Sequence, residues 1–145
     1  MKVIVYCPFF GKAPPWFNLV LFSMKLNSAV DFVLIGDHVG TLANKFATNF
    51  NAPNINGVYM NTMEYRNGFQ KLYNNTLRWS DVICSGYKCG RNVRNKISDT
   101  RPFLGYLFEN ITLKYSWWGW MDLDVILGDI TQLIHRELGN DVICP

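Results

Sequence analysis

The sequence lacks most of the features that assign a chain to a specialised class of protein. Its 145 residues contain four cysteines, none in Cys-x-x-Cys spacing, so neither a zinc site nor a disulfide framework is indicated. The apolar run at the N-terminus is too short to span a membrane and lacks the pattern of a secretory signal. We therefore expect a cytoplasmic protein with reduced thiols and no transmembrane segment.

Charged residues are also scarce, at 17% of the chain, and the formal net charge is +3. So mild a charge argues neither for nor against an anionic ligand. The two histidines, His38 and His135, have no partners at metal-ligand spacing. Hydrophobic residues make up 49% of the chain and aromatic residues 15%, which excludes wholesale disorder and indicates a core or a groove built from rings. The length suits a single domain over residues 1–145.

Short apolar runs rich in β-branched residues alternate along the chain with segments of helical periodicity. This alternation favours an α/β fold, in which a mostly parallel sheet is covered by helices on both faces. Irregular structure is expected between residues 81 and 100. The predicted strands are 3–7, 31–37, 58–60, 114–125 (running into a loop) and 141–144, and the predicted helices are 16–27, 41–50, 63–73, 102–109 and 131–138.

The segment 116-SWWGWMDLDVILGDI-130 places Asp122 and Asp124 one residue apart in apolar and aromatic surroundings. In an extended chain both side chains point the same way, with Cα atoms about 6.5 Å apart. Two carboxylates at that separation suit Mn²⁺ or Mg²⁺ bound jointly with a phosphate. No Lys, Arg or His between Ser116 and Gln132 can neutralise them, so their partner must come from elsewhere. Because Asp-x-Asp also arises by chance, a solvated turn is the alternative.

Two other predicted strands end in residues suited to ligand binding. Tyr6, Pro8 and Phe9 end the first strand, and Asp37 ends the second. Ligands of open α/β sheets bind beyond the carboxyl ends of the strands. There a ring can stack on a base, and a carboxylate can bind a base edge or a ribose hydroxyl. The alternatives are an aromatic core cluster, and an aspartate that caps the following helix.

A basic stretch, residues 88–101, precedes the predicted helix at 102–109. Lys96, Asp99 and Arg101 lie at its end, where the N-terminus of the helix can attract an anion. A solvated charged loop is the plainer interpretation. Nucleic-acid binding is a weaker alternative, because the chain is only mildly basic and its aromatic residues are not interleaved with the cations.

Taken together, four segments resemble the GT-A-fold glycosyltransferases of bacterial and large-virus polysaccharide synthesis. They are PFFGKAPPWFNLVLFS, DFVLIGD, K-x-x-D-x-R-P and WGWMDLDVILGDI. The resemblance implies a GT-A (Rossmann-like) three-layer sandwich that binds a nucleotide sugar, with a divalent metal on its diphosphate. It also implies that Asp122 and Asp124 are the metal-binding pair, and that Asp124 is the favoured direct ligand. The implied nucleotide-binding residues are Lys96, Asp99 and Arg101 near the diphosphate, ribose or sugar, and Tyr6, Pro8, Phe9 and Asp37 near the base.

The expected function is therefore transfer of a sugar from a UDP-sugar to a glycan acceptor. One alternative is a non-catalytic nucleotide-sugar-binding module, and another is a nucleic-acid-binding protein that uses residues 88–101. Glycosyltransferases of this kind usually continue into an acceptor-binding half. We accordingly expect residues 1–145 to form the donor-binding half, with a partner chain or self-association through the strand predicted at 141–144.

Overall fold

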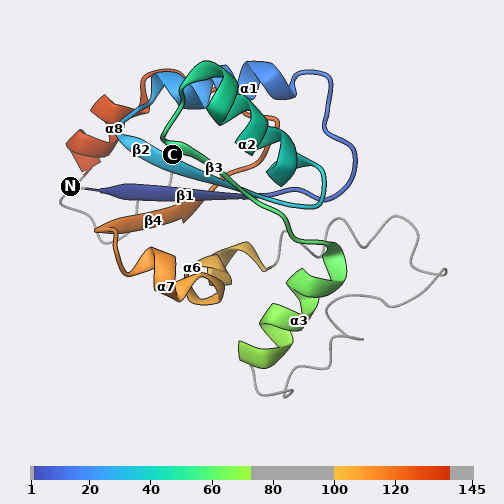
Figure 1. Ribbon diagram of the computed structural model, residues 1–145. Helices are drawn as coiled ribbons and strands as arrows, with labels where there is room; N and C mark the ends of the chain where they lie inside the picture. The colour runs from blue at the N-terminus through green and yellow to red at the C-terminus, as the bar shows by residue number, and fades with distance from the viewer. Residues whose placement is uncertain (1, 73–99, 138–145) are drawn as a thin grey trace.

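The computed structural model describes residues 2–72 and 100–137 (Figure 1). Its centre is a four-stranded sheet in the order β3-β2-β1-β4, in which every pair of neighbours is parallel. The predicted α/β class with a parallel sheet is thus confirmed, and the fold is Rossmann-like. The strands are β1 (Val3–Pro8), β2 (Val30–Ile35), β3 (Ile55–Val58) and β4 (Trp117–Trp120).

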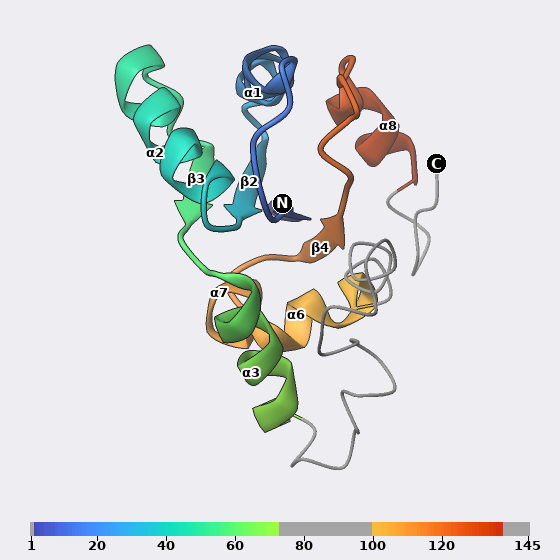
Figure 2. The same cartoon turned by 90° about the vertical axis from the view of Figure 1, so that its right-hand side faces the viewer.

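Helices cover both faces of the sheet and make a three-layer arrangement (Figure 2). Helices α1, α2 and α8 lie on one face, and α3, α6 and α7 lie on the other. A 3₁₀ turn, η2 (Arg101–Phe103), leads into α6. The helices are α1 (Phe17–Leu26), α2 (Val39–Phe50), α3 (Thr62–Leu72), α6 (Leu104–Leu107), α7 (Glu109–Thr112) and α8 (Ile130–Glu137).

The central strands are apolar on both sides because each side faces a layer of helices. In β1, Val3 and Cys7 join the core beneath α1 and α2, whereas Ile4 and Tyr6 join the core against α3 and α6. Successive side chains of a strand point to opposite faces, so a continuous apolar run fills two cores at once. Burial raises the pKa of the Cys7 thiol, which is free and buried.

Most predicted elements in the described ranges are confirmed with bounds within two residues, and three differ by more. The third strand is 55–58 rather than 58–60, because α2 stops at Asn51 in a left-handed conformation and the chain turns into the sheet at once. The helix predicted at 102–109 is three short helical pieces that end by Thr112. The fourth strand is limited to β4, so both aspartates lie in the loop beyond it. The strand predicted at 141–144 falls outside the described residues.

No helix in the ranges 2–72 and 100–137 combines the length and the apolar character needed to cross a membrane.

The strand order decides where a ligand site can form. From β1 the chain adds β2 and β3 on one side of the sheet, and then returns to add β4 on the other side of β1. The connections that leave β1 and β4 therefore diverge at the carboxyl edge of the sheet. In open α/β sheets, the crevice at such a switch in strand order is where ligands bind.

Candidate functional site

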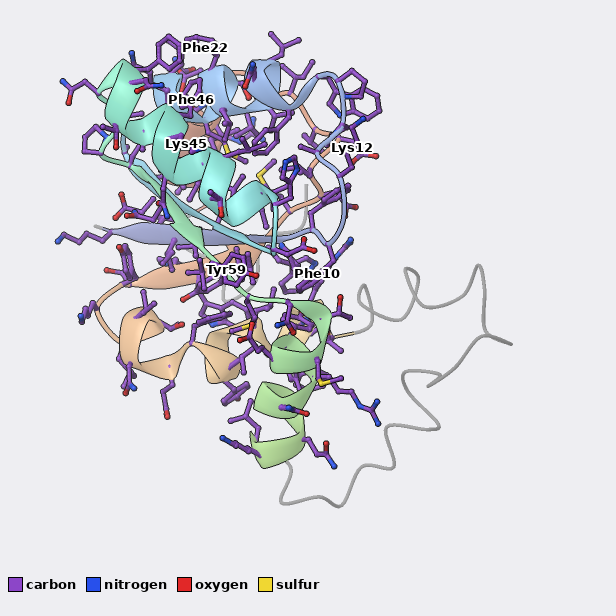
Figure 3. The ribbon with its side chains drawn as sticks, turned by 45° about the vertical axis from the view of Figure 1, so that its right-hand side comes forward. Phe10, Lys12, Phe22, Lys45, Phe46 and Tyr59 are labelled. Atoms are coloured by element: carbon purple, nitrogen blue, oxygen red, sulfur yellow. The ribbon has the colours of Figure 1, made fainter. Side chains whose placement is uncertain are left out.

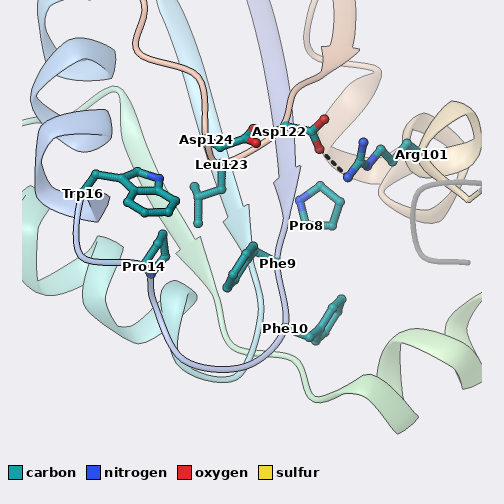
Figure 4. A pocket seen from close by; sticks show the side chains of 9 residues that line it. All are labelled: Pro8, Phe9, Phe10, Pro14, Trp16, Arg101, Asp122, Leu123 and Asp124. Atoms are coloured by element: carbon teal, nitrogen blue, oxygen red, sulfur yellow. Dashed lines mark ion pairs between the residues drawn. The ribbon is translucent and has the colours of Figure 1, made fainter. Parts of the chain in front are cut away.

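A pocket of about 330 Å³ opens at the carboxyl ends of β1 and β4, at the switch in strand order (Figure 4). Its volume falls within the range of small-molecule sites, near the lower end. The wall combines two carboxylates, one guanidinium and a set of aromatic rings and prolines. The lining residues are Pro8, Phe9, Phe10, Pro14, Trp16, Arg101, Asp122, Leu123 and Asp124.

The two aspartates reach the pocket because the residue between them is anchored in the core. After β4, the backbone N–H of Met121 donates to the carbonyl of Tyr6 at 3.1 Å, which continues the pairing with β1 for one more residue. Leu123 is then buried, at 4% exposure, in the core beneath α1 and α2. Asp122 and Asp124 flank this anchor and are exposed, and both line the pocket.

Arg101 is the partner that the sequence left unidentified for the carboxylates. Its guanidinium forms an ion pair with Asp122 through Nη2 and Oδ1. The arginine side chain is 19% exposed and the aspartate side chain 49%, so the pair lies in the wall of the pocket with its carboxylate toward solvent. Within the described part of the chain, Nε of Arg101 is buried and has no hydrogen-bond partner. The guanidinium is therefore only partly satisfied.

Tyr65 of α3 contacts both the residue before Arg101 and the loop after β1. The Tyr65 hydroxyl and Thr100 Oγ1 are 2.8 Å apart in a buried hydrogen bond, and burial raises the pKa of Tyr65 to about 12. Phe10 contacts the edge of the Tyr65 ring, with ring centroids 5.0 Å apart, and lies between the sheet and α3 (Figure 3). The loop after β1 and the turn that carries Arg101 thus share one packing partner on α3.

The end of β1 and the loop after it supply the aromatic and proline side chains of the lining, with Pro14 and Trp16 at the end away from Arg101 (Figure 4). Phe9 and Trp16 come from this loop, and Trp16 is 48% exposed although its indole is large. Gly36 allows Phe9 to take this position, because a Cβ at residue 36 would collide with the carbonyl oxygen of Phe9. Pro8 and Phe9 were predicted as site residues from the sequence, whereas Phe10, Pro14 and Trp16 were not. The cluster of rings and prolines in 8-PFFGKAPPW-16 was the available signal.

Two residues predicted to lie near a base are placed outside the pocket lining. Tyr6 is fully buried on the α6 side of the sheet, where its hydroxyl lies 2.8 Å from Thr112 Oγ1. Asp37 Oδ1 accepts hydrogen bonds from the backbone N–H groups of Gly11 and His38, at 3.2 and 2.9 Å. The Gly11 bond is the main reason why the pKa of Asp37 is lowered. Asp37 therefore fastens the loop after β1 rather than facing the pocket.

The predicted roles of Lys96 and Asp99 stay predictions, because both residues lie outside the described ranges. Arg101, the third member of that motif, lines the same pocket as the two aspartates. The structure therefore brings together Pro8, Phe9, Arg101, Asp122 and Asp124 from the predicted set.

The donor set of the pocket fits a divalent cation that is shared with a ligand. No cluster of three or more His, Cys, Asp or Glu side chains occurs in residues 2–72 and 100–137, so these residues offer no all-protein cage. The carboxylates of Asp122 and Asp124 are hard oxygen ligands on one wall, and Arg101 already pairs with Asp122. Mg²⁺ and Mn²⁺ are commonly held by one or two carboxylates, with phosphate oxygens and waters at the other positions.

Comparison with known proteins gives a family but no activity. A family model described as "Family of unknown function (DUF6625)" matches residues 4–143. No curated protein and no solved structure matches the chain.

Proposed function

The chain belongs to this family of unknown function, and we propose from the chemistry of its pocket that it is a metal-dependent glycosyltransferase acting on a UDP-sugar and a glycan acceptor. One observation carries the proposal. Two carboxylates and a guanidinium line a pocket at the switch in strand order of a parallel sheet, and the ring of Trp16 lies at the end opposite the guanidinium. The resemblance to GT-A-fold enzymes supports the same function.

The charged end suits a diphosphate with its cation. Asp124 and Asp122 would hold Mn²⁺ or Mg²⁺, and Arg101 would donate to a phosphate oxygen in the fork geometry that favours phosphates. When bound, the cation supplies positive charge that stabilises the diphosphate as a leaving group. In the transfer, the acceptor hydroxyl oxygen bonds to the anomeric carbon, the bond from that carbon to the diphosphate oxygen breaks, and the hydroxyl proton passes to the released diphosphate or to solvent water.

The aromatic end suits the base. Trp16 and Arg101 lie at opposite ends of the pocket, with Leu123 between them (Figure 4). A nucleoside diphosphate has the same polarity, with a planar ring at one end and negative charge at the other. A half-exposed indole can stack on any base, because every base has a π-face. Such a ring contributes affinity without fixing which nucleotide is bound.

The proposed function is tested by the stability of the full chain with its ligands. UDP and Mn²⁺ together, at about 100 times the apparent dissociation constant, should raise the free energy of unfolding by about 2.7 kcal/mol. UDP alone should stabilise the protein less. The proposal fails if no nucleotide diphosphate or nucleotide sugar stabilises the chain with either cation. Release of UDP from a UDP-sugar with Mn²⁺ present distinguishes an enzyme from a module that only binds.

Replacing Trp16 by alanine should weaken binding of UDP with Mn²⁺ about tenfold, because base stacking is worth about 1–3 kcal/mol. Pyrophosphate with Mn²⁺ has no base and should bind the variant as it binds the wild type. Isothermal titration with both ligands measures the difference. Trp120→Ala is the matched control, because Trp120 is 46% exposed and is not part of the lining. Equal losses for UDP and pyrophosphate would show that Trp16 does not contact the base.

A further inference from the structure

The ion pair between Arg101 and Asp122 occupies both groups that a cation and a diphosphate would use. A cation that takes Asp122 must separate it from Arg101, and a phosphate that takes Arg101 must separate it from Asp122. The pair is open to such exchange, because the Asp122 side chain is half exposed. The Nε of Arg101 is buried and has no hydrogen-bond partner in the described part of the chain, so the ion pair with Asp122 leaves the guanidinium incompletely satisfied.

Charge balance penalises either ligand when it binds alone. With a cation alone, the mostly buried guanidinium of Arg101 would lose its counter-ion and face a second positive charge. With a diphosphate alone, Asp122 and Asp124 would both face an anion with no positive partner. When both ligands are present, the carboxylates face the cation and the guanidinium faces a phosphate, so every charge has an opposite partner.

We propose that Arg101 exchanges partners in this pocket, leaving Asp122 for a phosphate oxygen of the ligand, so that the divalent cation and the nucleotide diphosphate each strengthen binding of the other. This inference rests on the proposed function, and it adds that binding of the cation and binding of the nucleotide regulate each other. Arg101 acts on the cation indirectly, as a residue that controls whether Asp122 is available. Because coupling between two sites is reciprocal, the two ligands must gain affinity by the same factor, and such factors typically fall between about 5 and 150.

The first test measures Mn²⁺ alone, by titration followed by electron paramagnetic resonance. Arg101→Gln should bind Mn²⁺ at least about fivefold more tightly than the wild type, because Asp122 no longer has a competing cation. Lys114→Gln is the control for net charge, since Lys114 is exposed and lies at the opposite end of β4 from the pocket. Its Mn²⁺ affinity should stay within about twofold of the wild type, because solvent and salt screen distant charges. The proposal is overturned if Arg101→Gln binds Mn²⁺ as tightly as the Lys114→Gln control, or more weakly.

The second test uses the other partner and a ligand of opposite charge. In buffer with EDTA, Asp122→Asn should bind UDP at least about fivefold more tightly than the wild type, because Arg101 is released and one negative charge is gone. Glu109→Gln removes the same charge from an exposed residue outside the pocket lining and should stay within about twofold. UDP binding by Asp122→Asn that is no tighter than in the control overturns the proposal.

The two tests also separate this proposal from the function it rests on. Absence of UDP binding under every condition would contradict the proposed function, whereas the Mn²⁺ titration would still decide whether Arg101 competes for Asp122. UDP binding that depends on Mn²⁺, with no gain in Mn²⁺ affinity for Arg101→Gln, would leave the function standing and remove the exchange. Far-UV circular dichroism and a urea unfolding midpoint for each variant show that the comparison is between folded proteins.

Discussion

Replacing Asp124 by asparagine is expected to weaken Mn²⁺-dependent UDP binding by about 100-fold, or ~2.7 kcal/mol. Asp124 is the carboxylate that remains available in the pocket, because Arg101 pairs with Asp122. An amide oxygen carries no net charge, so it binds a divalent cation much less strongly than a carboxylate does. Isothermal titration with UDP at fixed Mn²⁺ measures the loss.

The loss should disappear when the cation is removed. In EDTA, Asp124→Asn should bind UDP no more weakly than the wild type, because the carboxylate only repels a phosphate without a cation between them. Glu109→Gln serves as the control for loss of one exposed negative charge, and its UDP affinity should equal that of the wild type in both buffers. UDP affinity of Asp124→Asn equal to the wild type in Mn²⁺ would contradict a metal-binding role for Asp124.

The parallel sheet was predictable because its signal is local. Runs such as 3-VIVYC-7 and 31-DFVLI-35 are apolar at every position, which is typical of strands covered on both faces. The helices between them show their own periodicity over ten residues or more. Hydrophobic pattern therefore identified the layers, and its largest errors in bounds were the third strand, the helix at 102–109 and the fourth strand.

The pocket was less predictable because it depends on strand order. Nothing in the spacing of the strands says on which side of β1 the fourth strand joins the sheet. That choice places the loop after β1 beside the two aspartates and brings Trp16 into the lining. It also brings Arg101 to Asp122, 21 positions away in the sequence. The absence of Lys, Arg and His from residues 116–132 correctly indicated that the partner comes from outside this segment, but it could not identify which residue.

Tyr6 and Asp37 show a second limit. Both lie at or near the carboxyl end of a strand, as a ligand-binding residue should, yet alternation decides that Tyr6 points away toward Thr112. Sequence alone does not tell which face of a strand borders the pocket when both faces are apolar. Asp37 is held away from the pocket by a hydrogen bond from the backbone N–H of Gly11. The pattern of side chains in a sequence cannot predict such a bond, because every residue except proline has a backbone N–H.

Replacing Leu123 by alanine is expected to lower the free energy of unfolding by about 2–3 kcal/mol, the lower part of the range for buried leucines. Leu123 is 4% exposed and packs into the core beneath α1 and α2, although it belongs to a loop. It is also the anchor that fixes the direction of Asp122 and Asp124. We therefore expect the folded variant to bind UDP with Mn²⁺ about tenfold more weakly, although Leu123→Ala removes no charge.

Urea unfolding measures the stability of Leu123→Ala. Titration with UDP and Mn²⁺, at low temperature and without urea, measures its binding. Leu26→Ala is the matched control, because Leu26 is 84% exposed and the same substitution there should change stability by no more than about 0.5 kcal/mol. Leu123→Met keeps the buried volume and should retain most of both properties. If Leu123→Ala loses stability while Mn²⁺-dependent UDP binding is unchanged, the carboxylates do not depend on this anchor. Their positions would then be set by the backbone pairing of Met121 with Tyr6 alone.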